Sequence, residues 1–242
     1  MPRSVAINVG ANTNAPGIRG PIFPDGSFEF VPIPETEPIC EPVPTYGDLP
    51  LSIELPDELR ETAVHFDPEF AAFGPGERYT YGDPYGVKAR PLLDLDEGDL
   101  VFFYATLDFH GEAAPDGICP DWGAYLIGRF RLARDPIEGE AFETLPAETR
   151  ALFRNNAHRK RDTFDARVLL HGDPDASGLL ETAIPLSAKS GAEPNRLVTH
   201  QSSDSGEGPW WRRPLRFDAE GTQVLQAVLA GDDRPRASTD PD

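Results

Sequence analysis

The chain has 242 residues and a formal net charge of −19, because 41 acidic residues stand against 22 lysines and arginines. Its 39% hydrophobic content is enough for a buried core and excludes wholesale disorder, while no apolar run approaches the roughly 20 residues that cross a bilayer. The first residues lack the apolar stretch of a signal peptide, and neither Cys40 nor Cys119 has a partner at zinc-binding spacing, so we expect a cytoplasmic, soluble protein without a disulfide framework.

The first predicted element is a strand over residues 4–9, in which Val5, Ile7 and Val9 alternate with smaller or polar residues. A Gly- and Asn-rich loop over residues 10–20 follows, and loops of this length are uncommon unless they are functional. Its backbone N–H groups could bind an oxyanion, with Arg19, the only base of the loop, as the charged contact. An ordinary surface connection is the alternative that the sequence leaves open.

Residues 20–34, GPIFPDGSFEFVPIP, predict a hairpin. The sequence Pro24-Asp25-Gly26 is turn chemistry, because Pro presets φ, Asp can bond its own backbone and Gly supplies a positive φ. Pro32 and Pro34 cannot donate to a ladder, so the outgoing strand must end there or lie at a sheet edge. Asp25 is the one obvious ionisable candidate that this hairpin contributes to chemistry.

The remaining elements alternate irregularly between strands and short helices. We expect a short helix over 56–62, strands over 100–107, 124–132 and 167–171, and helices over 146–156 and 219–230. This order favours an α+β fold with a mixed, mostly antiparallel sheet or a small PUA-like barrel, and a few peripheral helices. We expect a single domain over residues 1–230 and a disordered acidic tail over 231–242.

The segment His65-Phe66-Asp67-Pro68-Glu69 is a compact cluster of ionisable groups. In an extended chain His65 and Asp67 share one face, as a general base and the group that orients it would. The alternative is a turn, since Asp-Pro starts turns and a single histidine is usually structural. No second histidine lies at ligand spacing, so the sequence predicts no metal site, and it leaves the cofactor unknown.

Residues 79–90, YTYGDPYGVKAR, combine aromatic side chains with Lys88 and Arg90. Aromatic faces flanked by cations suit a flipped or single-stranded base, with Tyr85 as a stacking surface and Arg90 as a phosphate contact. Tyrosines on either side of a turn can equally pack against the core, and both interpretations stay open.

An acidic, lysine-poor composition is typical of proteins that work in concentrated salt, where charge repulsion is screened. The scarce positive charge gathers in two segments, residues 150–167 with six bases against two acids, and residues 209–217 with three arginines and no acid. The first segment contains His158, Arg159 and Arg161, which could hold nucleic-acid phosphates. The alternative is that these arginines pair with surface carboxylates.

The chain resembles the third nucleotide-modification-associated domain family. The resemblance begins with the glycine-rich loop and the P-I-x-P-D-G and P-I-P pattern of residues 20–34, and continues through His65-Phe66-Asp67-Pro68. Residues 98–104, GDLVFFY, resemble the family's G-D-L-x-x-F-[FY] strand, and Asn156-Ala157-His158 resembles its N/H-P-H segment. The chain departs from the family pattern in its first loop, which lacks the basic S-R-x-G-x-D pattern, and at Ala157, where Pro is usual.

The resemblance implies a part in DNA base modification, with DNA or a nucleotide and other base-modification enzymes as partners. Our leading hypothesis takes Asp25, His65 and Asp67 as candidate acid–base groups, and Tyr85 and Tyr104 as stacking surfaces. The strand over residues 100–107 and the one that follows it are also similar to small PUA-like barrels such as the EVE and ASCH domains. That weaker likeness implies a non-catalytic reader of modified bases as the alternative function.

Overall fold

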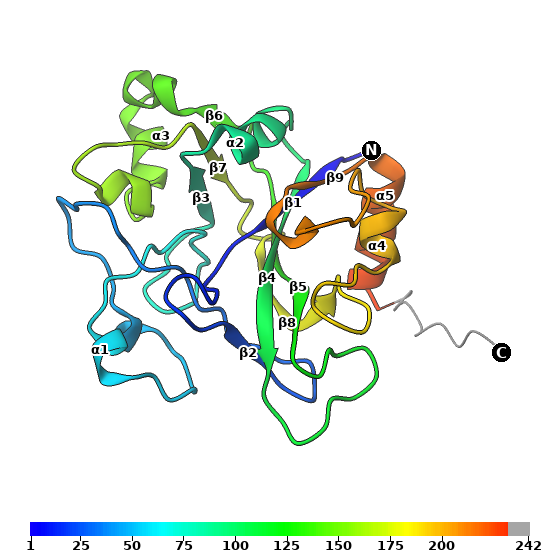
Figure 1. Cartoon of the computed structure of the whole chain (residues 1–242). Helices are drawn as coiled ribbons and strands as arrows, with labels where there is room; N and C mark the ends of the chain where they lie inside the picture. Colours follow the sequence, from blue (N-terminus) through cyan, green and yellow to red (C-terminus); the bar gives the residue numbers. More distant parts are fainter. Residues whose placement is uncertain (232–242) are drawn as a thin grey trace.

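Two open β-sheets with short helices around them make up the fold in the computed structural model, which describes residues 1–231 (Figure 1). The strands are β1 (Ser4–Asn8), β2 (Gly20–Ile22), β3 (Thr80–Asp83), β4 (Leu100–Phe109), β5 (Trp122–Arg131), β6 (Ile137–Glu138), β7 (Val168–His171), β8 (Gly178–Pro185) and β9 (Leu215–Phe217). The α-helices are α1 (Asp57–Arg60), α2 (Gly86–Leu93), α3 (Ala147–Leu152), α4 (Arg196–Thr199) and α5 (Ala219–Leu229).

The larger sheet has the strand order β8-β5-β4-β1-β9, and β2 also pairs with β4. β1 and β2 both run parallel to β4 along the same edge, with Asn8 beside Tyr104 and Gly20 beside Leu107. The loop over residues 9–19 therefore leaves this edge and returns to it a short distance further along. The other pairings of this sheet are antiparallel.

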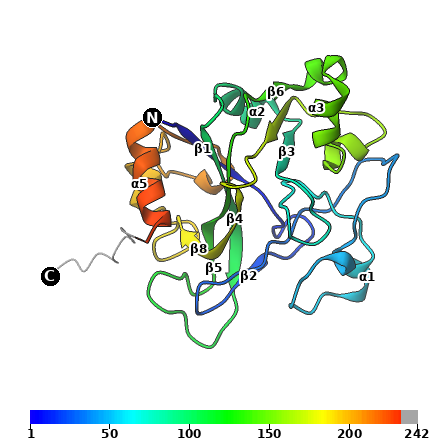
Figure 2. The ribbon, with the colours of Figure 1, turned by 180° about the vertical axis from the view of Figure 1, so that it is seen from behind.

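The central strand β4 is apolar on both faces because both faces are covered. On one face Val101 and Phe103 belong to a cluster with residues of β3, β7 and α2. On the other face Phe102 and Tyr104 belong to a cluster with residues of α4 and α5. Figure 1 shows the result, with α4 and α5 on one side of β4 and the second sheet and α2 on the other. Figure 2 shows α5 and the second sheet on opposite sides of β4 from behind.

The second sheet is small and antiparallel, with the order β3-β7-β6. A third apolar cluster lies outside both sheets, where Val31, Tyr46, Val64 and Phe66 pack together. This cluster fixes the long segment between β2 and β3, which holds little regular structure. The position of that segment determines where the candidate site forms.

The expected α+β fold with mixed and mostly antiparallel sheets is confirmed, whereas the PUA-like barrel is not, because the sheets are open. The predicted turn is present, with Gly26 at φ 83°, but the outgoing segment makes only an isolated bridge from Phe28 to Ile22. The prolines and the early departure of this segment towards Tyr46 explain the missing strand. No helix within residues 1–231 is long and apolar enough to cross a membrane.

Several elements were not expected from the sequence, namely β3, β6, β8, β9, α2 and α4. Helix α2 contains Gly86 at its start and Pro91 in its interior, and both residues are unfavourable inside helices. Strand β8 is half-buried at the sheet edge and has no clear alternation. The predicted helix over 146–156 ends at Leu152, and a separate 3₁₀ turn begins at Ala157. The predicted disordered tail lies, apart from Gly231, outside the described residues.

Candidate functional site

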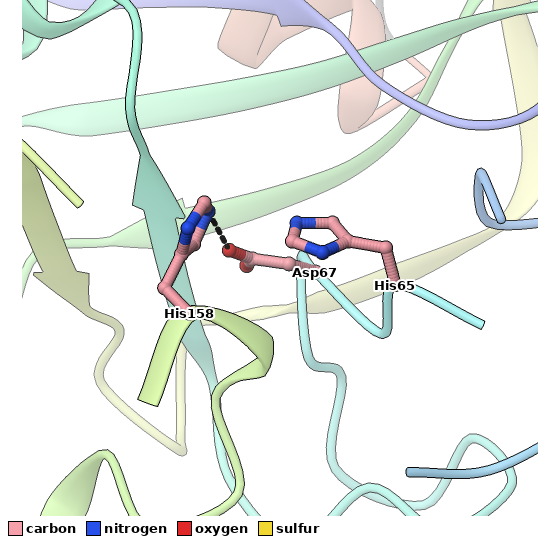
Figure 3. Close-up of side chains that lie close together, drawn as sticks. All are labelled: His65, Asp67 and His158. Atoms are coloured by element: carbon pink, nitrogen blue, oxygen red, sulfur yellow. Dashed lines mark ion pairs between the residues drawn. The ribbon is translucent and has the colours of Figure 1, made fainter. Parts of the chain in front are cut away.

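Three side chains from two distant segments meet in the interior: His65, Asp67 and His158 (Figure 3). One nitrogen of each histidine and one carboxylate oxygen lie within 4.8 Å of one another, and all three residues are buried. The two imidazole rings lie on either side of the carboxylate, with centroids 4.8 Å apart and planes at 81°. Strands β3 to β6 lie between Asp67 and His158 in the sequence, so only the folded chain creates this cluster.

The backbone places Glu35 next to His65. The segments around residues 34 and 64 run antiparallel, with the N–H of Glu35 donating to the carbonyl of Ala63 (2.9 Å) and that of His65 to Ile33 (2.9 Å). In consequence an oxygen of Glu35 lies 2.7 Å from Nδ1 of His65. The P-I-P segment thus supplies the partner that orients the histidine.

His158 is placed by a capped 3₁₀ turn over Ala157–Lys160. The side chain of Asn156 accepts a hydrogen bond from the backbone N–H of His158 (3.1 Å) and so starts the turn. Nδ1 of the His158 ring lies 2.7 Å from an oxygen of Asp165. Each histidine therefore has its Nδ1 against a carboxylate, and its Nε2 is free for the centre of the cluster.

Arg161 connects the two carboxylates. Its guanidinium donates to Glu35 (2.9 and 3.2 Å) and to Asp165 (2.6 Å), and only 10% of its side chain is exposed. Burial alone would raise the pKa of Glu35, but hydrogen bonds from His65 and Arg161 lower it to about 2. Burial alone would also raise the pKa of Asp165, but the interactions with His158 and Arg161 outweigh this effect and lower the pKa.

The protonation of the histidines follows from these ionised carboxylates, which can only accept hydrogen bonds. The 2.7 Å contacts favour a proton on Nδ1 of each histidine, which its carboxylate accepts. The guanidinium of Arg161 also lies 3.1 Å from Nδ1 of His65 and 3.4 Å from Nδ1 of His158. Burial lowers the pKa of His65, which keeps its ring neutral at pH 7 and leaves a lone pair on Nε2.

Asp67 is held by strand β3. The N–H of Gly82 donates to one oxygen of Asp67 (2.7 Å), and Nε2 of His158 lies 3.4 Å from the same oxygen. Among the described residues, neither the other oxygen of Asp67 nor Nε2 of His158 has a hydrogen-bond partner. Burial raises the pKa of Asp67 well above its usual range, so this carboxylate needs a proton or a cation to offset its charge.

Position 82 must be a glycine, because the ring of His158 and the carboxylate of Asp67 lie close to its backbone. A Cβ at this position would lie 2.6 Å from Cδ2 of His158 and 3.3 Å from an oxygen of Asp67. Any larger residue would push the ring or the carboxylate out of place. The glycine thus lets β3 pass directly behind the cluster.

The cluster opens into a cavity of about 380 Å³. Its walls include the start of the first loop, Asn8 to Asn12, the end of β3 at Asp83, and Tyr85 and Lys88 at the start of α2. Lys88 donates to the backbone carbonyl of Asn8 (3.0 Å) and lies 3.5 Å from Asp83. The loop, the tyrosine-rich segment and the His65 segment, which the sequence singles out separately, therefore share one pocket.

Three predicted site residues lie elsewhere. Asp25 is on the exposed hairpin turn, where it accepts hydrogen bonds from Ser27, and does not join His65 and Asp67. Arg19 packs over the ring of Trp122 and pairs with Asp108. Tyr104 is fully buried in the core, where burial raises its pKa and its hydroxyl donates to the carbonyl of Arg213, so it offers no stacking surface.

The predicted cations do not gather in one place. Arg161 lines the pocket but is enclosed by its carboxylates, Arg159 pairs outside with Glu41 at 3.6 Å, and Arg90 is exposed on α2. Tyr85 lies at the pocket mouth with 70% of its surface exposed. His158, predicted as a nucleic-acid contact, is instead a member of the buried cluster.

The second basic segment is also tied to the protein itself. Trp210 is fully buried, and its indole N–H donates to the carbonyl of Ala192 (2.9 Å). Arg213 pairs with Asp204 at 2.9 Å, and Arg216 lies 3.9 Å from Asp94. The ion-paired interpretation fits both of these arginines.

Sequence reasoning missed four residues that support the cluster, namely Glu35, Gly82, Asp83 and Asp165, and singled out Lys88 only as a cation beside the tyrosines. Glu35 directly follows the P-I-P ending, and Gly82 and Asp83 form part of the Gly-Asp-Pro turn signal, so local signals existed for these three. Nothing in the sequence around Asp165 distinguishes it from the other acidic residues of the chain. Its role depends on a contact with His158 that only the fold shows.

Two imidazole nitrogens and a carboxylate that face one another can serve acid–base chemistry, since each can take up or release a proton. The same three groups are also ligands of the kind that hold divalent metal ions. His65, Asp67 and His158 are the residues within 1–231 that could hold such an ion.

The comparison with protein families gives one match, to the family described as nucleotide modification associated domain 3, over residues 3–227 of the 242. No curated protein and no solved structure matches the chain. The matched range contains both sheets and all members of the buried cluster. The chain therefore belongs to the nucleotide modification associated domain 3 family.

Proposed function

We propose that this protein binds a nucleobase, as a nucleotide or in DNA, and acts in or alongside its modification, with the pocket above His65, Asp67 and His158 as the active site. The observation that carries the proposal is the convergence of these three buried groups at a cavity of about 380 Å³. A cavity of this volume is within the range of small-ligand sites. The family membership supports a nucleotide or a nucleobase as the class of substrate.

The residues that line the pocket favour a catalytic role over the role of a reader of modified bases. A reader would hold its base between aromatic walls, but the hydroxyl of Tyr81 is tied to Asp83 (2.7 Å) and Tyr85 stands at the mouth. Ionisable groups, rather than aromatic faces, occupy the floor. Buried acids and bases that cost stability are concentrated at active sites.

A nucleotide or an unpaired base is a better substrate than intact duplex DNA. Duplex binding depends on many phosphate contacts spread over a surface, and the predicted arginines are scattered or paired with carboxylates. Lys88, with 27% of its side chain exposed, is placed to contact one phosphate at the pocket. Tyr85 can stack on a base that enters, and Arg90 on the same helix remains a candidate for a further phosphate contact.

The proposed roles follow from the hydrogen bonds. Nε2 of His65 faces the pocket as a proton acceptor, and Glu35 holds the ring in the required tautomer. Nε2 of His158 and the free oxygen of Asp67 are the other groups that can exchange protons with a bound base.

The test is binding and mass analysis in molar KCl with mononucleotides, single-stranded and duplex oligonucleotides. We expect saturable binding of a mononucleotide or a single strand, weakened at least about fivefold, or about 1 kcal/mol, in Lys88→Gln. Arg216→Gln, a surface arginine outside the pocket, is the matched control and should bind as the wild type does. Absence of both binding and any nucleoside mass change in the wild type would overturn the proposal.

A further inference from the structure

We infer that His65, Asp67 and His158 form a binding site for one divalent first-row transition-metal ion, held by Nε2 of each histidine and the carboxylate of Asp67. The inference goes beyond the proposed function and shares its pocket. Its test is metal binding, which needs no nucleic acid, so the two can fail separately.

The first support is the direction of the unpaired groups. Nδ1 of both histidines donates outward to a carboxylate, so the lone pairs on Nε2 face inward. They meet the carboxylate of Asp67, and neither Nε2 of His158 nor the second oxygen of Asp67 has a hydrogen-bond partner among the described residues, although the side chain of Asn156 lies close to this carboxylate. Buried acceptors that face one another without a donor between them are costly unless a cation lies among them.

The second support is spacing. Two ligand atoms bonded to one ion at about 2.1 Å lie about 3.0–3.4 Å apart in octahedral or tetrahedral geometry. Nε2 of His158 lies 3.4 Å from the nearer oxygen of Asp67, and all three ligand atoms fall within 4.8 Å. The ligand atoms that lie furthest apart would have to approach one another by up to about 1.4 Å to reach bonding geometry.

The third support is the surrounding shell. Ligand histidines commonly donate their other nitrogen to a carboxylate, which fixes the tautomer and makes the ligand more basic. Glu35 does this for His65 and Asp165 for His158, each at 2.7 Å. Arg161 holds both carboxylates, so one side chain aligns both halves of the shell.

The fourth support is charge. Five carboxylates lie in or directly beside the pocket, against two permanent cations, Arg161 and Lys88. These carboxylates are Glu35, Glu37, Asp67, Asp83 and Asp165. A divalent ion would offset the excess negative charge where it is most deeply buried.

The donor set indicates the class of metal. Two imidazoles and one carboxylate suit Zn²⁺, Fe²⁺, Co²⁺ and their neighbours, whereas Ca²⁺ and Mg²⁺ prefer oxygen ligands only. Three protein ligands also leave coordination positions open towards the pocket, as catalytic metal sites do. An ion held here would face whatever ligand the cavity admits.

The experiment uses the full chain, stripped with EDTA and titrated with Co²⁺ and with Zn²⁺ in 2 M KCl, which suppresses unspecific binding to the acidic surface. We expect one ion per chain, seen as a saturating visible Co²⁺ band that Zn²⁺ displaces. His158→Gln and Asp67→Asn should lose more than the about 10- to 100-fold in affinity that loss of an outer-shell partner costs.

His110→Gln, which changes an exposed histidine outside the pocket, is the matched control and should keep the wild-type stoichiometry. Asp67→Asn is nearly isosteric, so it remains informative if His158→Gln does not fold. Absence of a stoichiometric site in the wild type overturns the inference, as does equal affinity in folded Asp67→Asn. Base modification by the EDTA-stripped protein without any metal site would overturn the metal inference alone, whereas metal binding without nucleotide binding or modification would overturn the proposed function alone.

Discussion

Arg161 is the residue on which the geometry of the site depends most. It donates to Glu35 and Asp165, and those two carboxylates in turn align His65 and His158. A buried ion pair contributes little net stability when intact, but removing one partner leaves an uncompensated charge. The adjacent Arg159 provides a contrast, because its pair with Glu41 lies in solvent.

We therefore expect Arg161→Gln to lower the free energy of unfolding by about 3–5 kcal/mol. Arg159→Gln should change it by less than about 1 kcal/mol, because exposed pairs contribute little. Urea denaturation of both variants in molar KCl measures the difference. Equal effects of the two substitutions would contradict the enclosed network described here.

The Asp67→Asn substitution tests how much the buried charge of this carboxylate lowers the stability of the folded protein. The substitution removes a charge from a buried position while an oxygen can still accept from the N–H of Gly82. In EDTA we expect thermal unfolding of the variant at or above the wild-type temperature, with a gain of up to about 2 kcal/mol. Addition of Zn²⁺ should raise the unfolding temperature of the wild type only.

A fall of the Asp67→Asn unfolding temperature in EDTA would show that the carboxylate is already compensated by a protonated histidine. Thermal melts with and without Zn²⁺ decide between the two outcomes.

At this scale the sequence predicted part of the site. His65 and Asp67 were recognised because they are two positions apart, and local patterns carry such information. His158 was noticed for its charge and not as their partner, because no sequence spacing encodes a contact across the fold. The same limit applies to Tyr104, whose residue type suits stacking but whose alternating strand places it in the core.

Strand β3 is the element that organises the site. Its Gly82 donates to Asp67, its Asp83 lies 3.5 Å from Lys88, and α2 begins immediately after it. The strand also joins the small sheet to the core through Tyr81. A change in this strand therefore acts on the site and on the packing together.

Gly82→Ala should displace the ring of His158, because the added Cβ would lie 2.6 Å from Cδ2. We expect a loss of about 1–3 kcal/mol in the free energy of unfolding and at least about a tenfold loss in Co²⁺ affinity. Gly178→Ala in β8, where nothing lies within 4 Å of the added Cβ, should stay within about 0.5 kcal/mol. Unchanged Co²⁺ affinity in folded Gly82→Ala would contradict this role of the glycine.

The elements that the sequence predicted best are those with strong patterns. The alternating β1, the doubly buried β4 and the helix α5 were expected close to their observed bounds. α2 and β8 were missed because their residues oppose the structure they adopt, and packing against β1, β3 and β5 overrides local preference. The barrel alternative was wrong because sheet closure depends on pairings between strands far apart in the chain.

For the whole molecule, charge is the dominant property. A net charge of −19 opposes the compact state at low salt, because like charges repel over about 10 Å at 0.1 M salt and over about 3 Å at 1 M. Many of the arginines are already paired with carboxylates. Because acidic residues outnumber basic ones by 41 to 22, a large negative charge remains after this pairing.

Raising KCl from about 0.1 M to about 2 M should raise the unfolding temperature by at least about 3 °C, or about 1 kcal/mol for a chain of this size. Sucrose of equal osmolality separates screening from the general effect of excluded solutes. An unfolding temperature that is unchanged by KCl, or raised equally by sucrose, would contradict a stability limited by repulsion.

The in-line arrangement of β1 and β2 along β4 has a consequence for how the pocket can be altered. Both ends of the loop over residues 9–19 are anchored to one strand, so its length can change without shifting the register of the sheet. Only the beginning of the loop lines the cavity, above groups that belong to other segments. Exchange of this loop between homologues should therefore alter which molecules enter the pocket while leaving His65, Asp67 and His158 in place. The loop is therefore the best segment in which to change the ligand selectivity of the protein.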